Sequence, residues 1–205
     1  MISRIIALLL LFTVFAPFAV AQQTPQKPST PCTLTAEDYA VYAAVVNDLG
    51  KPEDPEEAWK DKEILIVDAT TAQNDVKGRK GWGFRSNSKA APGKETVADF
   101  EANAGSTCPL TESFGNPQSY SMITHAEVDK FFSSKRDGWG KFYKKYPKAA
   151  GFWDFSRPGF DTAHHEALIY LGHYCGSLCG TGHFLFLTKE NGQWKVTNRL
   201  MLWIS

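Results

Sequence analysis

The stretch EALIYLGHYCGSLCGTGHFLFLTKENGQWKVTNRLMLWI, residues 166–204, decides the fold. Apolar, β-branched and aromatic residues dominate three runs within it, at 166–174, 183–188 and 194–204. Such runs are typical of strands. Asn191-Gly192 separates the last two runs and is the strongest short hairpin signal, because both positions accept a positive φ. Glycines between the first two runs indicate a tight, irregular connection. The sequence therefore predicts an antiparallel three-stranded meander at the C-terminus.

The two hairpins also predict a register. A first hairpin centred on Leu178 places His173 opposite His183, and a second at Asn191-Gly192 places Leu187 opposite Val196 and His183 opposite Leu200. One face of the meander is then uniformly apolar and carries Ala167, Ile169, Leu171, Leu185, Leu187, Val196, Leu200 and Leu202. The other face carries Leu168, Tyr170, Phe184, Phe186, Met201 and Trp203. Because the second set is also too apolar for water, we expect both faces to be covered at least in part.

Residues 1–21 have the features of a signal peptide. Arg4 precedes an apolar run, which ends in the small-x-small cleavage pattern Ala19-Val20-Ala21. The alternative, a membrane anchor, is disfavoured because the run is short for a span and a polar, Pro-rich tether follows at 22–31. The sequence therefore predicts export to the periplasm or beyond, no membrane span after cleavage, and one domain at 32–205.

Capping signals predict helices in the N-terminal two-thirds of that domain. Thr35-x-x-Asp38 and Thr124-x-x-Glu127 resemble capping boxes, and Asp137 can cap a further helix. Apolar spacing adds a helix at 94–104 and strands at 63–70 and 152–155. The predicted fold class is α+β, with N-terminal helices packed on an antiparallel sheet that ends in the meander.

Bulk charge does not indicate a polyanionic partner. The chain has 22 basic and 22 acidic residues, so no nucleic-acid partner is expected. Residues 72–93 combine basic residues with Trp82 and Phe84, a pattern that can bind anionic polymers or bases. A solvated surface loop is the favoured interpretation of that segment.

The four cysteines allow two chemistries. In an exported chain they favour two disulfides, and we expect Cys175 to pair with Cys179 and Cys32 with Cys108. The alternative is a tetrahedral zinc site, because two nitrogens and two sulfurs fall within eleven residues, at His173, Cys175, Cys179 and His183. That spacing is not a standard zinc-binding pattern, and no other cofactor is indicated. A thiol-redox role and a cysteine nucleophile with a histidine base are weaker alternatives for the same cluster.

A second polar group precedes the meander. Asp161, His164, His165 and Glu166 are residue types used in acid–base and metal chemistry. Exposed polar residues at a strand edge are the simpler interpretation.

The C-terminal motifs FSRPGFD, EALIYLGHYCGSLCGTG, GQWKV and WIS resemble those of a family of small exported bacterial proteins without an assigned activity. The resemblance covers about the last third of the chain, implies an exported domain and transfers no catalytic residue. The sequence also contains no complete catalytic constellation. The leading hypothesis is therefore an exported, non-catalytic domain that binds a ligand or has a structural role, and the alternative is a metal-binding or thiol-redox protein that uses the hairpin cluster.

Overall fold

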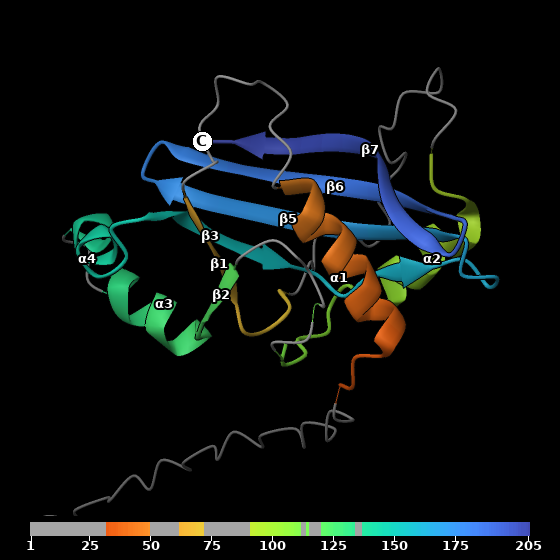
Figure 1. Cartoon of the computed structure of the whole chain (residues 1–205), viewed down its shortest axis with the longest axis horizontal. Helices are drawn as coiled ribbons and strands as arrows, with labels where there is room; N and C mark the ends of the chain where they lie inside the picture. Colours follow the sequence, from red (N-terminus) through yellow and green to blue (C-terminus); the bar gives the residue numbers. More distant parts are fainter. Residues whose placement is uncertain (1–31, 50–61, 72–90, 112–113, 115–119, 134–136) are drawn as a thin grey trace, which may run out of the picture. The chain divides into compact units, whose positions relative to one another are not determined.

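The computed structural model describes residues 32–49, 62–71, 91–111, 114, 120–133 and 137–205 (Figure 1). The predicted signal peptide, the Pro-rich tether and residues 72–90 of the predicted basic loop lie outside the described residues. All described residues belong to one compact unit, which spans Pro31–Ser205.

The C-terminal meander forms as predicted. It consists of β5 (Glu166–Gly176), β6 (Cys179–Glu190) and β7 (Gln193–Ile204), which pair in antiparallel order. Asn191 and Gly192 both adopt a positive φ at the second hairpin, 51° and 78° respectively. This is the backbone conformation for which Asn-Gly is selected in two-residue hairpins.

The register of the first hairpin differs from the prediction by two residues. Leu171 pairs with His183, and His173 pairs with Thr181 instead of His183. The hairpin closes at Gly176 and Cys179, and an irregularity follows at once between Tyr174 and Gly176. A shift of two residues leaves every side chain on its predicted face, because the side-chain period of a strand is two. The predicted apolar faces of β5 and β6 are therefore correct although the pairing was wrong.

The register of the second hairpin is correct at its start and wrong farther along. Leu187 pairs with Val196 as predicted, but His183 lies opposite Met201, and not opposite Leu200. Irregularities between Phe186 and Leu187 and between Gly182 and His183 insert extra residues into β7. A one-residue bulge reverses the faces beyond it, so Leu200 and Leu202 pack with the cluster on the other side of the sheet.

The remaining strands make the sheet mixed, which corrects the purely antiparallel sheet that the sequence predicted. The sheet order is β2-β1-β3-β5-β6-β7, and the short β4 (Gly159–Phe160) pairs with β5. β1 (Glu63–Val67) runs parallel to both β2 (Tyr120–Ile123) and β3 (Ala149–Phe155). Helices connect β1 to β2 and β2 to β3, and such crossovers permit parallel pairing.

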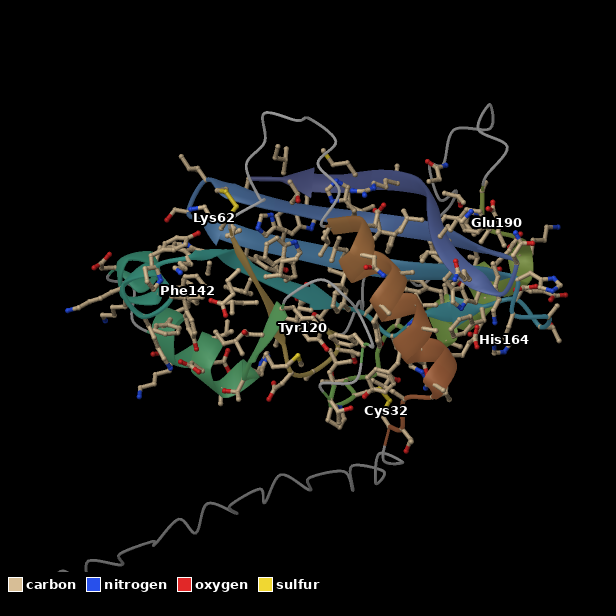
Figure 2. The ribbon with its side chains drawn as sticks, in the orientation of Figure 1. Cys32, Lys62, Tyr120, Phe142, His164 and Glu190 are labelled. Atoms are coloured by element: carbon tan, nitrogen blue, oxygen red, sulfur yellow. A yellow bond between two sulfur atoms is a disulfide. The ribbon has the colours of Figure 1, made fainter. Side chains whose placement is uncertain are left out.

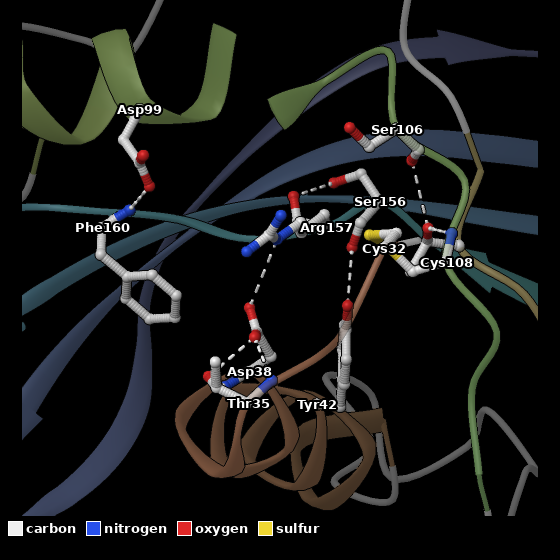
Figure 3. Close-up of polar contacts among 11 residues, drawn as sticks. Cys32, Thr35, Asp38, Tyr42, Asp99, Ser106, Cys108, Ser156, Arg157 and Phe160 are labelled. Carbon is white, nitrogen blue, oxygen red and sulfur yellow. Dashed lines mark hydrogen bonds and ion pairs between the residues drawn. A yellow bond between two sulfur atoms is a disulfide. The ribbon is translucent and has the colours of Figure 1, made fainter. Parts of the chain in front are cut away.

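The predicted capping signals begin the helices. Thr35 and Asp38 cap each other at the start of α1 (Ala36–Leu49): the Thr35 N–H donates to Asp38 Oδ2 at 2.6 Å, and the Asp38 N–H donates to Thr35 Oγ1 at 3.2 Å (Figure 3). Thr124 caps α3 (His125–Phe132), and Asp137 caps α4 (Gly138–Lys145). The fourth helix, α2 (Lys94–Asn103), begins without a side-chain cap from its own N-cap residue, Gly93.

Helix α1 covers the first face of the sheet. Val41, Tyr42, Val45 and Val46 are fully buried against apolar residues of β1, β3, β5 and β6. Polar contacts fix both ends of the helix. Glu37 accepts from Lys189 Nζ and from Trp194 Nε1, each at 2.6 Å, and Asp48 pairs with Arg199. The first face is thus covered by one continuous hydrophobic cluster.

The second face carries two separate clusters at opposite ends of the sheet. Helices α3 and α4 pack on β1 and β3, where Phe142 is fully buried, while α2 packs Phe100 on β5 and β6. Phe142 lies at one end of the sheet in Figure 2, and His164 marks the end at which α2 lies (Figures 1 and 2). Between these two clusters the sheet presents polar and aromatic side chains.

Candidate functional site

The cysteine–histidine cluster is closed by a disulfide. Cys175 is bonded to Cys179, and Cys32 to Cys108 (Figure 3), which are the expected pairs. His173 Nε2 lies 2.8 Å from the carbonyl oxygen of Ala150. The His173 ring stacks on Trp153 with centroids 4.1 Å apart.

The disulfide and the contacts of His173 bear on whether the four predicted zinc ligands can bind a metal. Burial lowers the pKa of His173, and the charge of His183 acts in the same direction. Both sulfurs are bonded to each other, and the described residues contain no group of three or more His, Cys, Asp or Glu with metal-binding geometry. Zinc at His173, Cys175, Cys179 and His183 stays a prediction for the reduced protein alone.

The polar group before the meander holds the backbone in place. Asp161 Oδ1 accepts from the N–H groups of His165 and Glu166, at 2.7 and 2.6 Å. Glu166 Oε2 accepts from the Gly93 N–H and from Thr96 Oγ1, at 2.7 and 2.8 Å, and so supplies the missing cap of α2. His164 adopts a positive φ of 54° and stacks on Phe160, with both histidines exposed. The two carboxylates are therefore committed to the turn and to the helix start.

A different group on the second face connects its two hydrophobic clusters, since Tyr174 packs against the α3–α4 cluster and Tyr170 belongs to the α2 cluster. We call it the Asp154 strip: Asp154 of β3, Tyr170, Gly172 and Tyr174 of β5, and Trp203 of β7. Asp154 pairs with Gly172, and Phe152 with Tyr174, so the strip crosses directly from β3 to β5. The Trp203 indole donates from Nε1 to the Tyr170 hydroxyl at 3.2 Å and connects the strip to β7.

Two glycines leave room for these side chains. A Cβ on Gly172 would lie 2.2 Å from Asp154 Oδ1 and 3.0 Å from the Tyr174 hydroxyl. A Cβ on Gly182 would lie 2.0 Å from Trp203 Nε1. The carboxyl group, the hydroxyl and the indole therefore rest directly on the backbone of β5 and β6, which no residue with a side chain permits at these positions.

Asp154 is the unusual member of the strip. Its Oδ1 is buried and has no hydrogen-bond partner among the described residues, although the residue as a whole keeps some exposed surface. Burial raises the pKa of Asp154 to about 6, although hydrogen bonds from the Thr71 side chain and the Gly172 backbone act to lower it. Burial, followed by the nearby charge of Asp154, raises the pKa of Tyr174 far above its ordinary value. Near neutral pH the strip thus combines a carboxyl group that has one unsatisfied oxygen atom with the neutral phenol of Tyr174.

The other buried polar atoms without hydrogen-bond partners have a structural explanation. In the described part of the chain these are Asp38 Oδ1 and Arg157 Nε. They lie 4.0 Å apart as an ion pair that joins α1 to the segment after β3 (Figure 3). The same segment accepts a hydrogen bond at the Ser156 carbonyl from the Tyr42 hydroxyl, at 3.3 Å. The Asp154 carboxyl group as a whole is hydrogen-bonded by the Thr71 side chain and the Gly172 backbone. Its Oδ1 atom has no ion-pair partner among the described residues, and unsatisfied buried polar atoms in a native structure call for a ligand, a water or a functional role.

The sequence carries one signal for Asp154, which the predictions above do not include. The run AAGFWDF has one charged residue within an otherwise apolar strand, and Asp is rare in strand interiors. The aromatic members belong to distant parts of the meander, and only the bulged register of β7 brings Trp203 beside Tyr170.

Comparison of the chain with protein-family models, with curated proteins and with solved structures finds no significant match. The helices in the described ranges include none that is long and apolar enough to cross a membrane.

Proposed function

We propose that this protein is an exported binding domain that holds a small ligand at the Asp154 strip. The observation that carries the proposal is the buried Asp154 Oδ1 without a hydrogen-bond partner, in a strip whose Tyr174 and Trp203 side chains are half-buried. Binding sites commonly combine aromatic surface with a small number of polar groups that fix the orientation of the ligand.

Binding fits the strip better than catalysis does. Proton-transfer catalysis generally needs an acid and a base that both titrate near the working pH. Within the strip only the pKa of Asp154 lies in that range, since the pKa of Tyr174 is raised away from it. The strip also holds no serine, cysteine or lysine to act as a nucleophile.

The test is a ligand-observed NMR screen of small neutral, cationic and anionic molecules against the mature chain. We expect hits whose binding is weakened at least tenfold by Asp154→Asn and by Trp203→Leu. The matched control is Lys195→Ala, because Lys195 lies on the same strand as Trp203 and its ion pair among the described residues is with exposed Glu190, at 2.6 Å. If the hits bind Asp154→Asn and Trp203→Leu with the same affinity as the unaltered chain, the placement of the site is wrong. A screen without hits would overturn the binding role.

Export has its own test. Expression of the full chain in a bacterial host, followed by cell fractionation and intact-mass measurement, should yield a periplasmic or secreted chain that begins at Gln22. A cytoplasmic chain that retains residues 1–21 would contradict this part of the proposal.

A thiol-redox role is the second candidate. It is favoured by the position of the Cys175–Cys179 disulfide at a hairpin end, where Cys179 and the neighbouring Leu178 are exposed. Titration against dithiothreitol and glutathione buffers separates a reactive disulfide from a structural one. A midpoint in the range of exchange proteins would support the redox role, whereas resistance to the glutathione pool would exclude it.

A further inference from the structure

The charge of Asp154 has no counter-ion in the described structure. Six ion pairs join described residues, and Asp154 takes part in none of them. An ionised carboxylate in a poorly hydrated place is stabilised by a positive charge brought close to it. A ligand that carries a positive charge and a hydrogen-bond donor would therefore complement the Asp154 carboxylate better than a ligand that carries only acceptors.

The aromatic rings around Asp154 form a row that suits such a cation. Trp139 of α4 lies 5.8 Å from Phe152, Phe152 lies 5.2 Å from Tyr174, and Tyr174 lies 5.7 Å from Trp203, measured between ring centroids. The Trp203 N–H donates to Tyr170, and one side of the indole lies on the β6 backbone at Gly182, so only the half-exposed remainder of the ring is offered to a ligand. Aromatic faces attract cations, and most strongly when water is excluded.

We propose that the ligand of the Asp154 strip is an organic cation with an apolar body, such as a quaternary or protonated amine. This inference rests on the proposed binding function. The carboxylate supplies the counter-charge, and the Tyr174 and Trp203 rings contact the apolar groups around the cationic nitrogen. An anion would meet both the negative carboxylate and the negative faces of the rings, so it is disfavoured at the same place.

The affinity for a cation should follow the ionisation of Asp154. The titratable groups that face Asp154 are Tyr170 and Tyr174 of β5 and, through charge only, His125 of α3. Burial raises the pKa of Tyr174, so this phenol stays neutral near pH 7. The charge of His125 acts on Asp154 from α3 and is a second charge that can affect cation binding. The variant His125→Gln separates the two effects.

The probes are choline and its uncharged analogue of equal shape, 3,3-dimethylbutan-1-ol. Binding to the mature chain is followed at the Trp203 indole N–H and the Gly172 amide by ¹H–¹⁵N NMR. We expect choline to bind at least tenfold more tightly than the alcohol at pH 7.5, and to weaken about tenfold at pH 5, where most Asp154 carboxyl groups are protonated. Asp154→Asn should remove the preference for choline, while His125→Gln should keep both the preference and the pH dependence.

A measurement on the unaltered protein guards against variants that fail to fold. Choline should lower the pKa of Asp154, as read from the ¹³C shift of its carboxyl carbon. If both probes bind equally tightly at the strip, the inference that the ligand is a cation is wrong, but the proposed site stands. Choline binding that leaves the pKa of Asp154 unchanged would also overturn that inference. If neither probe shifts the two strip resonances and the wider screen has no hits, the site itself is wrong.

Discussion

The two faces of the sheet are built from the same strands but are covered in different ways. Under α1 the first face is one continuous hydrophobic cluster, in which Phe155 is fully buried and packs 5.4 Å from Tyr42 between ring centroids. The second face is covered at its two ends and carries Asp154 between them. Because each side chain of a strand alternates between faces, one sequence can stabilise the fold with one face and keep the other for binding. The comparison predicts that changes on the first face affect stability, and changes in the strip affect pH dependence and binding.

The largest expected effect is on the first face. Phe155→Ala should destabilise the protein by about 3 to 5 kcal/mol, because it removes a large side chain from a close-packed cluster. Urea unfolding followed by circular dichroism measures the change. A loss of stability below about 1 kcal/mol would show that the cluster under α1 relaxes to fill the cavity left by the Phe155 ring. The first face would then contribute no more to stability than the second.

The two disulfides extend the comparison, since one precedes α1 and the other lies at the hairpin beside Tyr174. The sequence separations are 76 and 4 residues, so loop-closure entropy predicts losses of about 4.5 kcal/mol for Cys32→Ser/Cys108→Ser and about 2 kcal/mol for Cys175→Ser/Cys179→Ser. Thermal unfolding of the two double variants measures the difference. An equal loss in both would indicate that the hairpin disulfide also holds the strip in place.

The next effect belongs to the strip and depends on pH. The folded state raises the pKa of Asp154 from 3.8 to about 6, so between these values the folded chain binds the proton more often than the unfolded chain does. Its contribution is therefore present at pH 4 and is lost as the pH rises through 6, by about 2 kcal/mol after allowance for partial exposure. Asp154→Asn should lack this slope. Denaturant midpoints from pH 4 to 8 check it, and parallel curves for the two proteins would contradict the raised pKa.

The smallest effect concerns the attachment of α2 to the second face. Glu166→Gln should destabilise the protein by about 1 kcal/mol, because it weakens charge-assisted hydrogen bonds at the start of α2. The matched control is Glu190→Gln, which removes an exposed pair with Lys195 and should change stability by less than about 0.5 kcal/mol. If both variants lose the same amount in thermal unfolding, Glu166 does not act as a cap.

Local signals in the sequence predicted the local structure well. Thr35-x-x-Asp38 and Thr124-x-x-Glu127 begin helices, and Asn191-Gly192 forms the hairpin, because in each case a few neighbouring residues satisfy the backbone. The α+β class follows from these elements. The parallel pairing of β1 with β2 was missed, because the four-residue YSMI of β2 is too short to show a period and its partner is distant in sequence.

The candidate site was predicted less well, for a related reason. The sequence directed attention to His173, Cys175, Cys179 and His183, which are close along the chain. Asp154 and Trp203 are 49 positions apart, and their approach depends on bulges that no pattern in β7 announced. A binding site assembled from separate strands becomes visible only when the register is known to the residue.

The irregular pairing in β7 has a consequence for aggregation at high protein concentration. β7 is the last strand of the sheet order, and among the described strands its twelve residues pair only with β6. A long, flat strand in that position invites the edge of another copy to add to it and so begins aggregation. The two bulges interrupt its row of N–H and C=O groups, and Lys195 and Arg199 add charge along it. We therefore expect that the residues that interrupt the pairing of β7 also disfavour the addition of a second copy at this edge.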